Sequence, residues 1–478
     1  MAWLKLEDHY GRGDELDACD YDEPMTVETM IDRDVLATCL DRELERFVES
    51  NPKSKTLYER SQKSLVGGVP MPWMMRWAGG FPVFAKIAIG ARIIDVDDHT
   101  YIDFCLGDTG AMPGHDPEPV VRAITNQEKT GITTMLPTEN AAWVGEEMQR
   151  RFGLDRWMFT LTATDANRAA LRICRQITGR PKVLVYSYSY HGSVDESFAV
   201  AGPDGGTISR AGNVGPPVDP AVTTTAIEFN DLDALERALA TEEIACVLAE
   251  PAMTNMGIVL PDEGYLEHLR ELTRKYGTLL IIDETHTFSA GAGGCTRAWG
   301  LVPDLFTIGK AIGSGVPAGA LGLTKDVTDR LFDQADADYE DTGGVGGTLA
   351  GNALSMAAVR ATLSEVLTEE AFEYTIPLAT RFTEGVQSVI DENSLPWSVT
   401  QLGARAEYRF EAVPARNGTE AHGACDADLE RFLHIHALNR GVLITPFHNM
   451  ALMSPSTTVA DVDRHTEVFA EAVRDLLA

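Results

Sequence analysis

Short β-branched and apolar runs alternate with helix-compatible stretches in the middle of the chain, between about residues 118 and 345. The clearest runs cover residues 182–186, 246–249, 278–282 and 305–308. Such alternation is typical of a largely parallel sheet with helices on both faces. We therefore predict an α/β domain over residues 118–365, with its ligand site at the carboxyl ends of the strands.

The flanking regions are predicted to contribute a smaller α+β domain. Short strand-like runs separated by turns precede the central domain, and a long helix followed by further strands comes after it. The strands are expected at residues 81–84, 91–96, 101–104, 406–410 and 442–444, and the helix at 353–366. We assign residues 25–117 to an N-terminal arm with part of the small domain, and residues 366–478 to the C-terminal small domain.

The start of the chain divides at Met25. Residues 1–24 are acidic and lack the basic and apolar regions of a secretory signal or transit peptide, so we interpret them as an N-terminal extension outside the fold. Farther on, apolar residues recur at helical spacing, which predicts an amphipathic helix that packs on the fold as an arm. The residues of this stripe are Leu36, Leu40, Leu44 and Phe47.

Charge and cysteine usage narrow the possible partners. The 478 residues include 40 basic and 72 acidic ones, and the net charge of −32 repels nucleic acid and anionic lipid surfaces. No apolar run is long enough to cross a bilayer. The seven cysteines are scattered without a C-x-x-C pair, so we expect reduced thiols, no metal site and a cytoplasmic location.

Two residues that follow consecutive strand-like runs carry the strongest chemical signal. Asp283 ends an apolar run, where a buried carboxylate requires a cationic partner such as a protonated pyridine nitrogen. Lys310 follows the next run in a glycine-rich loop, where burial favours the neutral amine that forms a Schiff base. Either residue alone is compatible with a structural role, but together they predict a pyridoxal-phosphate site.

A third element lies at residues 162–167, where small hydroxyl residues precede a predicted helix. The free N–H groups of a helix start and the helix dipole attract anions, so Ala163 and Thr164 are candidates for binding a phosphate. The same residues also form a good helix N-cap without a ligand, and that alternative stays open.

The ordered set of motifs resembles the fold-type I pyridoxal-phosphate enzymes, specifically the class III aminotransferases and their glutamate-1-semialdehyde aminomutase-like branch. The motifs are Gly67-Gly68-Val69, Gly114-His115, Thr164-Asp165-Ala166, Tyr190-His191-Gly192, Glu250-Pro251, Asp283-Glu284-Thr285, Gly309-Lys310 and Gly347-Thr348-Leu349. The resemblance runs roughly over residues 66–454. It implies a large, mostly parallel seven-stranded sheet domain, a small α+β domain, pyridoxal 5'-phosphate as the cofactor and a homodimer with shared active sites.

The resemblance implies catalytic roles for two of these residues. Lys310 would bind the cofactor covalently and, once released, move the proton at the substrate carbon. Asp283 would hold the pyridine ring of the cofactor protonated. Tyr190 would stack on the ring face, and His191 beside it would also contact the cofactor.

Other roles are implied around the cofactor. Ala163 and Thr164 would donate hydrogen bonds to its phosphate, and Asn255 would reach the phenolic oxygen of its ring. Glu250 would shape the substrate side of the site, as a third catalytic candidate. Thr348 would cross the dimer interface and bind the partner's phosphate, so a monomer would lack a complete site.

The chain departs from the family's pattern where the substrate is expected. Thr445 stands where many relatives carry a mobile arginine that binds a carboxylate. A carboxylate would then be met by Arg76, Arg405 or Arg409, unless these are solvated surface residues. His286 stands where the family usually has Gln or Met, and we interpret it as a space-filling residue rather than one that packs on the cofactor ring.

The wall of the pocket is expected to be apolar. The candidates are Trp73, Met74, Met75, Trp77, Met112, Met135, Phe447 and Met450, with His448 as a further candidate for substrate contact. Such a wall suits a bulky or aromatic amine, although stripes of Met and Trp are also common in protein cores.

We therefore predict an aminotransferase that moves an amino group from an amine to a keto acid such as pyruvate by a ping-pong mechanism. The donor would be an arylalkylamine or an omega- or beta-amino compound. Two alternatives remain open at this point. One is an aminomutase or racemase of the glutamate-1-semialdehyde aminomutase type, and the other is a non-catalytic cofactor-binding protein derived from the same fold.

Overall fold

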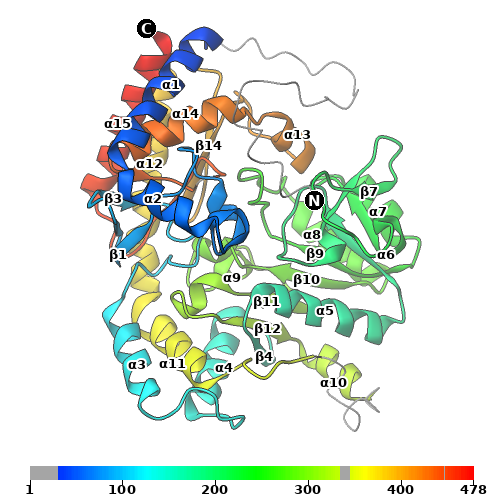
Figure 1. Ribbon diagram of the computed structural model, residues 1–478. Coiled ribbons are helices and arrows are strands. Elements are labelled where there is room, and N and C mark those ends of the chain that lie inside the picture. The colour runs from blue at the N-terminus through cyan, green and yellow to red at the C-terminus, as the bar shows by residue number, and fades with distance from the viewer. Residues whose placement is uncertain (1–30, 334–344, 446) are drawn as a thin grey trace.

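The computed structural model describes residues 31–333, 345–445 and 447–478 (Figure 1). The extension predicted over residues 1–24 and the start of the arm at Met25 lie outside the described residues. Within the described part of the chain, no helix combines the length and the apolar character needed to cross a membrane.

A seven-stranded sheet forms the centre of the molecule and confirms the predicted α/β fold. Its order is β4 (Arg156–Thr160), β12 (Gly319–Leu323), β11 (Leu305–Ile308), β10 (Leu279–Asp283), β9 (Ile244–Ala249), β5 (Lys182–Tyr186) and β8 (Thr224–Ile227). The strands β11, β10, β9, β5 and β8 are parallel, whereas β12 runs antiparallel to both of its neighbours. The sheet is thus mixed but mostly parallel.

Helices cover both faces of this sheet because successive strand residues point to opposite sides. Val183 and Ile281 share one buried cluster with α5 (Ala163–Thr178). Leu184 and Leu280 share another with α7 (Leu232–Leu239) and α8 (Tyr265–Lys275). The continuous apolar runs of the sequence therefore reflect burial on both faces.

Further helices and a small hairpin surround the large sheet. They are α3 (Glu118–Glu128), α4 (Glu139–Phe152), α6 (Pro220–Thr223), α9 (Gly294–Ala298), α10 (Lys325–Asp333), α11 (Ala353–Ala361), β6 (Ala199–Ala201) and β7 (Thr207–Ser209). The helix predicted over residues 353–366 is confirmed as α11, which continues directly into a π-helical turn at Thr362–Val366.

Two small sheets lie in the other half of the molecule, and one of them joins distant parts of the sequence. It has the order β1 (Ala85–Ile89), β2 (Arg92–Asp95), β3 (Thr100–Asp103) and β15 (Val442–Leu443). The second consists of β13 (Ser398–Leu402), β14 (Arg405–Arg409) and β16 (Met450–Leu452).

The core around these sheets is shared by residues from both ends of the described chain. Phe47 of the N-terminal arm and Phe104 after β3 belong to the same buried cluster as Phe382 and Phe469. The helices of this half are α1 (Arg33–Ser50), α2 (Pro52–Ser61), α12 (Glu369–Glu392), α13 (Gly418–Gly423), α14 (Ala427–Leu438) and α15 (Val459–Leu477). In Figure 1, α1, α12, α14 and α15 gather above the large sheet.

One predicted strand is wrong. Residues 81–84 form no strand, and pairing begins only at Ala85. The Phe81 and Phe47 rings pack together with their centroids 4.8 Å apart, and the Phe84 backbone N–H donates to Ser54 Oγ at 3.2 Å. The apolar character of this segment therefore serves packing against the arm rather than strand pairing.

Candidate active site

The carboxyl edge of the large sheet brings the two strongest sequence candidates together. Asp283 is the last residue of β10, and Lys310 follows β11 after Gly309. The two strands are parallel with Asp283 opposite Thr307, so they end at the same edge of the sheet. Lys310 has a φ of 48°, in the left-handed region where non-glycine residues are uncommon and often functional.

Asp283 is buried, and its carboxylate accepts four hydrogen bonds. His191 Nδ1 and Asn167 Nδ2 each lie 2.9 Å from Oδ2, while Thr285 donates to Oδ1 from its backbone N at 3.0 Å and from Oγ1 at 2.6 Å. Burial opposes a charge here, but the bonds, led by that from His191, lower the pKa of Asp283 to about 2. The carboxylate is therefore charged at neutral pH. We call these four residues the Asp283 wall.

Lys310 contacts two residues from distant parts of the chain. Its Nζ donates to Asp108 Oδ2 at 2.6 Å and lies 2.7 Å from His286 Nε2. Burial disfavours a charged Asp108, but Lys310 and His286 hold the pKa of its carboxyl well below the ordinary range. Burial and the neighbouring Lys310 ammonium hold the pKa of His286 well below its usual value, so the imidazole is neutral at pH 7.

The other nitrogen of His286 meets an arginine. His286 Nδ1 lies 3.0 Å from Arg405 Nη2 and 3.1 Å from Thr109 Oγ1, which also accepts from Arg405. Both ring nitrogens of His286 therefore lie within hydrogen-bond distance of a cationic side chain, Arg405 at Nδ1 and Lys310 at Nε2. We call Lys310, Asp108, Thr109, His286 and Arg405 the Lys310 wall.

The interpretation of His286 as a space-filling residue is therefore wrong. The turn after β10 carries its ring between Lys310 and Arg405, and both ring nitrogens are within hydrogen-bond distance of polar groups. A ring that only filled space would meet apolar atoms instead.

Glu250 follows β9 at the same edge of the sheet and is also buried. Its Oε2 accepts from Thr254 Oγ1 at 2.5 Å, whereas Oε1 has no hydrogen-bond partner among the described residues. Burial raises the pKa of Glu250 to about 7, against the opposing effect of His191. The group is therefore able to change its charge near neutral pH.

Aromatic side chains border the site. The Trp73 ring packs edge to face with the rings of Tyr190 and Phe447, with centroid distances of 5.2 and 5.4 Å. Burial, with Asp108 as the next cause, raises the pKa of Tyr190, so its hydroxyl stays protonated at neutral pH. Trp73 and Phe447 are two of the candidates for the apolar wall, and their contact with a substrate stays a prediction.

The start of α5 approaches two loops of the site. Thr162 caps the helix, and its Oγ1 accepts from the Asp165 backbone N–H at 3.2 Å. A Cβ added at Gly309 would lie 3.0 Å from the Ala163 backbone N, and one at Gly192 would lie 2.0 Å from Thr164 Oγ1. The 2.0 Å contact and the φ of 79° require glycine at 192, and the 3.0 Å contact leaves little room for a side chain at 309. These close approaches bring the loops after β5 and β11 onto the helix N-terminus.

The structure separates the three arginine candidates. Arg76 is exposed, beyond the 3-10 turn Pro72–Met75. Arg409 donates to the Ala421 carbonyl and lies 3.8 Å from Glu430. Of these three arginines, Arg405 is the one that belongs to the Lys310 wall, through Thr109 and His286.

The other candidates occupy different settings. His448 Nδ1 lies 3.3 Å from Glu407 Oε1, and Asn255 Nδ2 donates to the Tyr188 carbonyl at 2.8 Å. Thr348 lies in an exposed turn. Met135 is 77% exposed in this chain, and its place in the pocket wall stays a prediction.

Sequence reasoning did not find Asp108 or Thr109. Both follow β3 in a turn with left-handed backbone, φ 50° and 80°, and no strand pattern in the large domain leads to them. Positive φ at two consecutive non-glycine residues cannot be read from the sequence, and four residues separate them from the end of β3 at Asp103.

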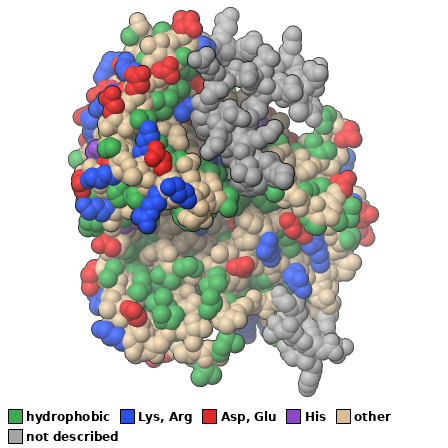
Figure 2. Space-filling model, in the orientation of Figure 1, with side chains coloured by type: hydrophobic (Ala, Val, Ile, Leu, Met, Phe, Trp, Pro, Cys, Tyr) green, Lys and Arg blue, Asp and Glu red, His purple; other side chains and the backbone are tan. Residues whose placement is uncertain are grey.

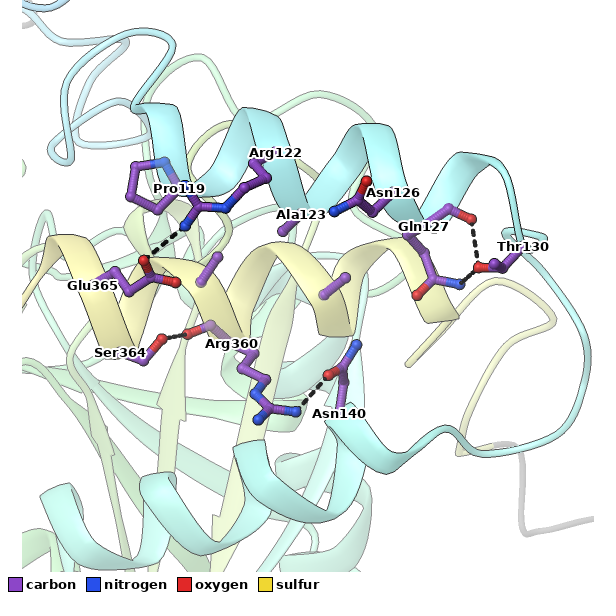
Figure 3. Close-up of a pocket in the computed structure, with 12 residues that line it drawn as sticks. Pro119, Arg122, Ala123, Asn126, Gln127, Thr130, Asn140, Arg360, Ser364 and Glu365 are labelled. Atoms are coloured by element: carbon purple, nitrogen blue, oxygen red, sulfur yellow. Dashed lines mark hydrogen bonds and ion pairs between the residues drawn. The ribbon is translucent and has the colours of Figure 1, made fainter.

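A separate surface groove of about 420 Å³ lies between α3 and α11 and is lined by other residues than those above (Figure 3). Its polar side chains bond to one another: Arg360 donates to Asn140 at 2.9 Å, and Arg122 pairs with Glu365 at 2.8 Å. The groove therefore offers few unpaired groups to a ligand.

The residues at the sheet edge fit a bound pyridoxal phosphate. Among the described residues, several buried polar atoms of the two walls and of Glu250 have no hydrogen-bond partner: His191 Nε2, Glu250 Oε1, Asp108 Oδ1 and Arg405 Nε. Unpaired buried polar atoms are costly, and a polar ligand relieves that cost. A charged carboxylate, a lysine amine and the start of a long helix match the ring nitrogen, the aldehyde and the phosphate of the cofactor.

The fold and this combination of groups define a fold-type I pyridoxal-phosphate-dependent enzyme, with pyridoxal 5'-phosphate as its cofactor. The chain belongs to the aminotransferase class-III family, whose model matches residues 73–473.

Relatives extend over nearly the whole chain. A solved glutamate-1-semialdehyde-aminomutase from Pseudomonas aeruginosa PAO1, with a variant in complex with PMP, is 47% identical, with a TM-score of 0.92 over 94% of this chain and 100% of that one. The glutamate-1-semialdehyde 2,1-aminomutase of Acidobacterium capsulatum is 34% identical over 89% of this chain and 99% of its own length. An omega-transaminase from Sphaerobacter thermophilus is 28% identical, with a TM-score of 0.81 over 89% and 98%.

Proposed function

We propose that this enzyme moves an amino group within one carboxylate-bearing substrate, as an aminomutase of the glutamate-1-semialdehyde type. The observation that carries the proposal is the 47% identity to the Pseudomonas aeruginosa protein over almost the full length of both chains, against 28% for the omega-transaminase. The main sequence prediction, an arylalkylamine transaminase, therefore has weaker support than its alternative.

When bound, pyridoxal phosphate supplies an electron sink that stabilises negative charge on the substrate carbon. The charged Asp283 would hold a proton on the ring nitrogen, because its pKa of about 2 keeps it anionic. The Lys310 amine would bind the cofactor and, when released, hold or deliver the proton at the reacting carbon. Asp108 and His286 hold that amine in place at 2.6 and 2.7 Å.

The remaining cofactor contacts are proposals from the same resemblance. Tyr190 would cover one ring face, and the N–H groups of Ala163 and Thr164 would bind the phosphate. Asn255 would reach the phenolic oxygen. Their support is the close approach of the Gly192 and Gly309 loops to the start of α5.

To test this proposal, the holoenzyme is incubated with glutamate-1-semialdehyde as the single substrate. Exchange of its amino group from C2 to C1 gives 5-amino-4-oxopentanoate, with no keto acid consumed. Chromatography of the product in the presence and absence of pyruvate measures this. Product formation that requires pyruvate, or none at all, contradicts the proposal.

A second candidate, the amine transaminase, is favoured by one observation, the edge-to-face contacts of Trp73 with Tyr190 and Phe447. They form an aromatic wall suited to a phenyl group. With 1-phenylethylamine and pyruvate as the only substrates, formation of acetophenone and alanine would support this candidate.

We also propose a homodimer in which Thr348 contacts the partner's cofactor. Exposed apolar residues surround its loop: Ile132, Met135, Leu136 and Leu349 are 41%, 77%, 74% and 49% exposed. The Ala353 backbone N–H donates to the Ile132 carbonyl at 3.0 Å, so the two loops adjoin. Figure 2 shows hydrophobic side chains gathered over this lower part of the molecule, and exposed apolar patches commonly mark interfaces.

The dimer is tested by Leu136→Asp, which places a charge in the patch. We expect dissociation and release of the cofactor, measured by sedimentation together with cofactor absorbance. Val302→Asp, at a 54% exposed site elsewhere, is the control. A fully loaded, active monomer contradicts the shared site.

A further inference from the structure

Arg405 is a buried cation whose guanidinium has no carboxylate partner among the described residues. Its relative exposure is 1%, and no aspartate or glutamate oxygen in the described part of the chain forms a salt bridge with it. Its Nε also has no hydrogen-bond partner there. An unpaired buried charge is strongly unfavourable unless a ligand of opposite charge completes the site.

Another buried arginine shows how this fold satisfies a structural guanidinium. Arg151 pairs with Glu147 at 2.7 Å and donates to the carbonyls of Leu363, Leu367 and Ala292. All of its partners belong to the protein, so it requires no ligand. Within residues 31–333, 345–445 and 447–478, the hydrogen-bond partners of the Arg405 guanidinium are Thr109 and His286 alone.

The acidic groups closest to Arg405 are engaged elsewhere. Burial lowers the pKa of Arg405, and the negative charges of Asp108 and Glu407 oppose that effect. However, Asp108 Oδ2 accepts from Lys310 at 2.6 Å, and Glu407 Oε1 lies 3.3 Å from His448 Nδ1. Neither carboxylate forms an ion pair with the guanidinium.

The position of Arg405 links it to the reacting amine. The His286 ring lies between the two side chains: its Nδ1 is 3.0 Å from Arg405 Nη2, and its Nε2 is 2.7 Å from Lys310 Nζ. An anion held by Arg405 would therefore lie beside the group that acts on the substrate. Thr445 is buried and has no charge, so it cannot take the place of a carboxylate-binding arginine.

We propose that Arg405 binds the substrate carboxylate, with Thr109 and His286 as positioning residues that hold the guanidinium toward Lys310. The planar guanidinium matches a carboxylate through two parallel hydrogen bonds. This inference deepens the proposed function, because it names the carboxylate end of the substrate as the group that the site recognises.

The test measures binding without turnover, using glutarate as the probe on the holoenzyme. Isothermal titration should show glutarate binding to the unchanged protein, and roughly 10- to 100-fold weaker binding to Arg405→Met, since a charge-assisted bond is lost. Arg405→Lys should restore part of the affinity. Arg76→Met tests the rival arginine: loss of binding there instead overturns the proposal.

Thermal unfolding separates binding from structure. Arg405→Met removes an unpaired buried charge, so its Tm should stay equal or rise. Arg151→Met, the matched change at a paired buried arginine, should lower Tm clearly. A fall of similar size in Arg405→Met, retained affinity in that variant, or no glutarate binding to the unchanged protein overturns the proposal.

Turnover is a separate measurement. In Arg405→Met the KM for glutamate-1-semialdehyde should rise more than kcat falls. If the unchanged enzyme converts no glutamate-1-semialdehyde yet loses glutarate binding in Arg405→Met, the proposed function fails and the carboxylate site stands.

Discussion

The Asp283 wall and the Lys310 wall border the same site but are built in different ways. In the first, Asp283 accepts four hydrogen bonds from protein donors, which fix its carboxylate in place, and His191 Nε2 is the atom without a partner among the described residues. In the second, two charged groups are incompletely paired, because Asp108 Oδ1 and Arg405 Nε have no protein partner among the described residues. The first wall is suited to hold one ion constantly, and the second to exchange partners when the cofactor and substrate bind.

The sharpest test of this difference is Lys310→Ala, which removes the reacting amine. Amino transfer should fall by at least about 10³-fold, because both covalent binding and proton transfer are lost. Borohydride treatment followed by peptide mapping should trap the cofactor on Lys310 in the unchanged enzyme. The control is Lys325→Ala, an exposed lysine paired with Asp329. Label on another lysine contradicts the assignment.

Asp283→Asn tests the rigid wall. The change preserves shape but removes the charge, and it turns an acceptor into a donor that faces His191 or Thr285. We expect activity to fall about 10²- to 10³-fold, as for other preorganised electrostatic groups. Steady-state kinetics on the loaded variant measures this, with cofactor absorbance to show that it is loaded. Activity within a fewfold of the unchanged enzyme would remove Asp283 from the mechanism.

Asp108→Asn tests the exchangeable wall. Loss of the 2.6 Å ion pair with Lys310 should lower kcat roughly 10- to 100-fold, the effect of one charge-assisted hydrogen bond. Asp108→Glu is the matched control, because it keeps the charge and should recover part of the rate. Equal rates in both variants would mean that the charge of Asp108 has no part in placing Lys310.

Glu250→Gln tests the buried Glu250 carboxyl through the pH dependence of the free energy of unfolding. The pKa of Glu250 is about 7 in the folded chain against an ordinary 4.5, so the folded state binds more protons and stability falls as pH rises from about 4.5 to 7. The variant does not lose this stability, so above pH 7 its free energy of unfolding should exceed that of the unchanged protein by on the order of 3 kcal/mol.

Urea unfolding of both proteins at pH 5 and pH 8 measures this difference. The gap between them should be small at pH 5 and large at pH 8. A constant gap would mean that Glu250 is not protonated in the folded chain.

Most of the Asp283 wall could be predicted because its key residue follows a buried strand. Asp283 and Lys310 stand directly after apolar runs, and parallel strands end at one edge, so local pattern places them near each other. His191 was found in the same way, after β5. Asn167, inside α5, was not singled out by its sequence context.

The Lys310 wall could not be predicted as a unit. Its residues come from a turn after β3, a turn after β10, the loop after β11 and the strand β14, which belong to different sheets. Arg405 was one of three arginine candidates, and His286 was interpreted as filling space. Nothing in the local sequence distinguishes a buried, unpaired guanidinium from a solvated one.

The sequence by itself determined the alternation of strands and helices, the family and the two residues that define the cofactor chemistry, because these depend on local periodicity and short motifs. The tertiary structure alone decided which arginine faces the lysine and that Asp108 and His286 flank its amine. Hydrogen bonds act over about 3 Å, and these residues lie 24 to 296 positions apart. Pairing of β10 with β11 brings His286 near Lys310, whereas Asp108 and Arg405 reach them through the packing of the two halves.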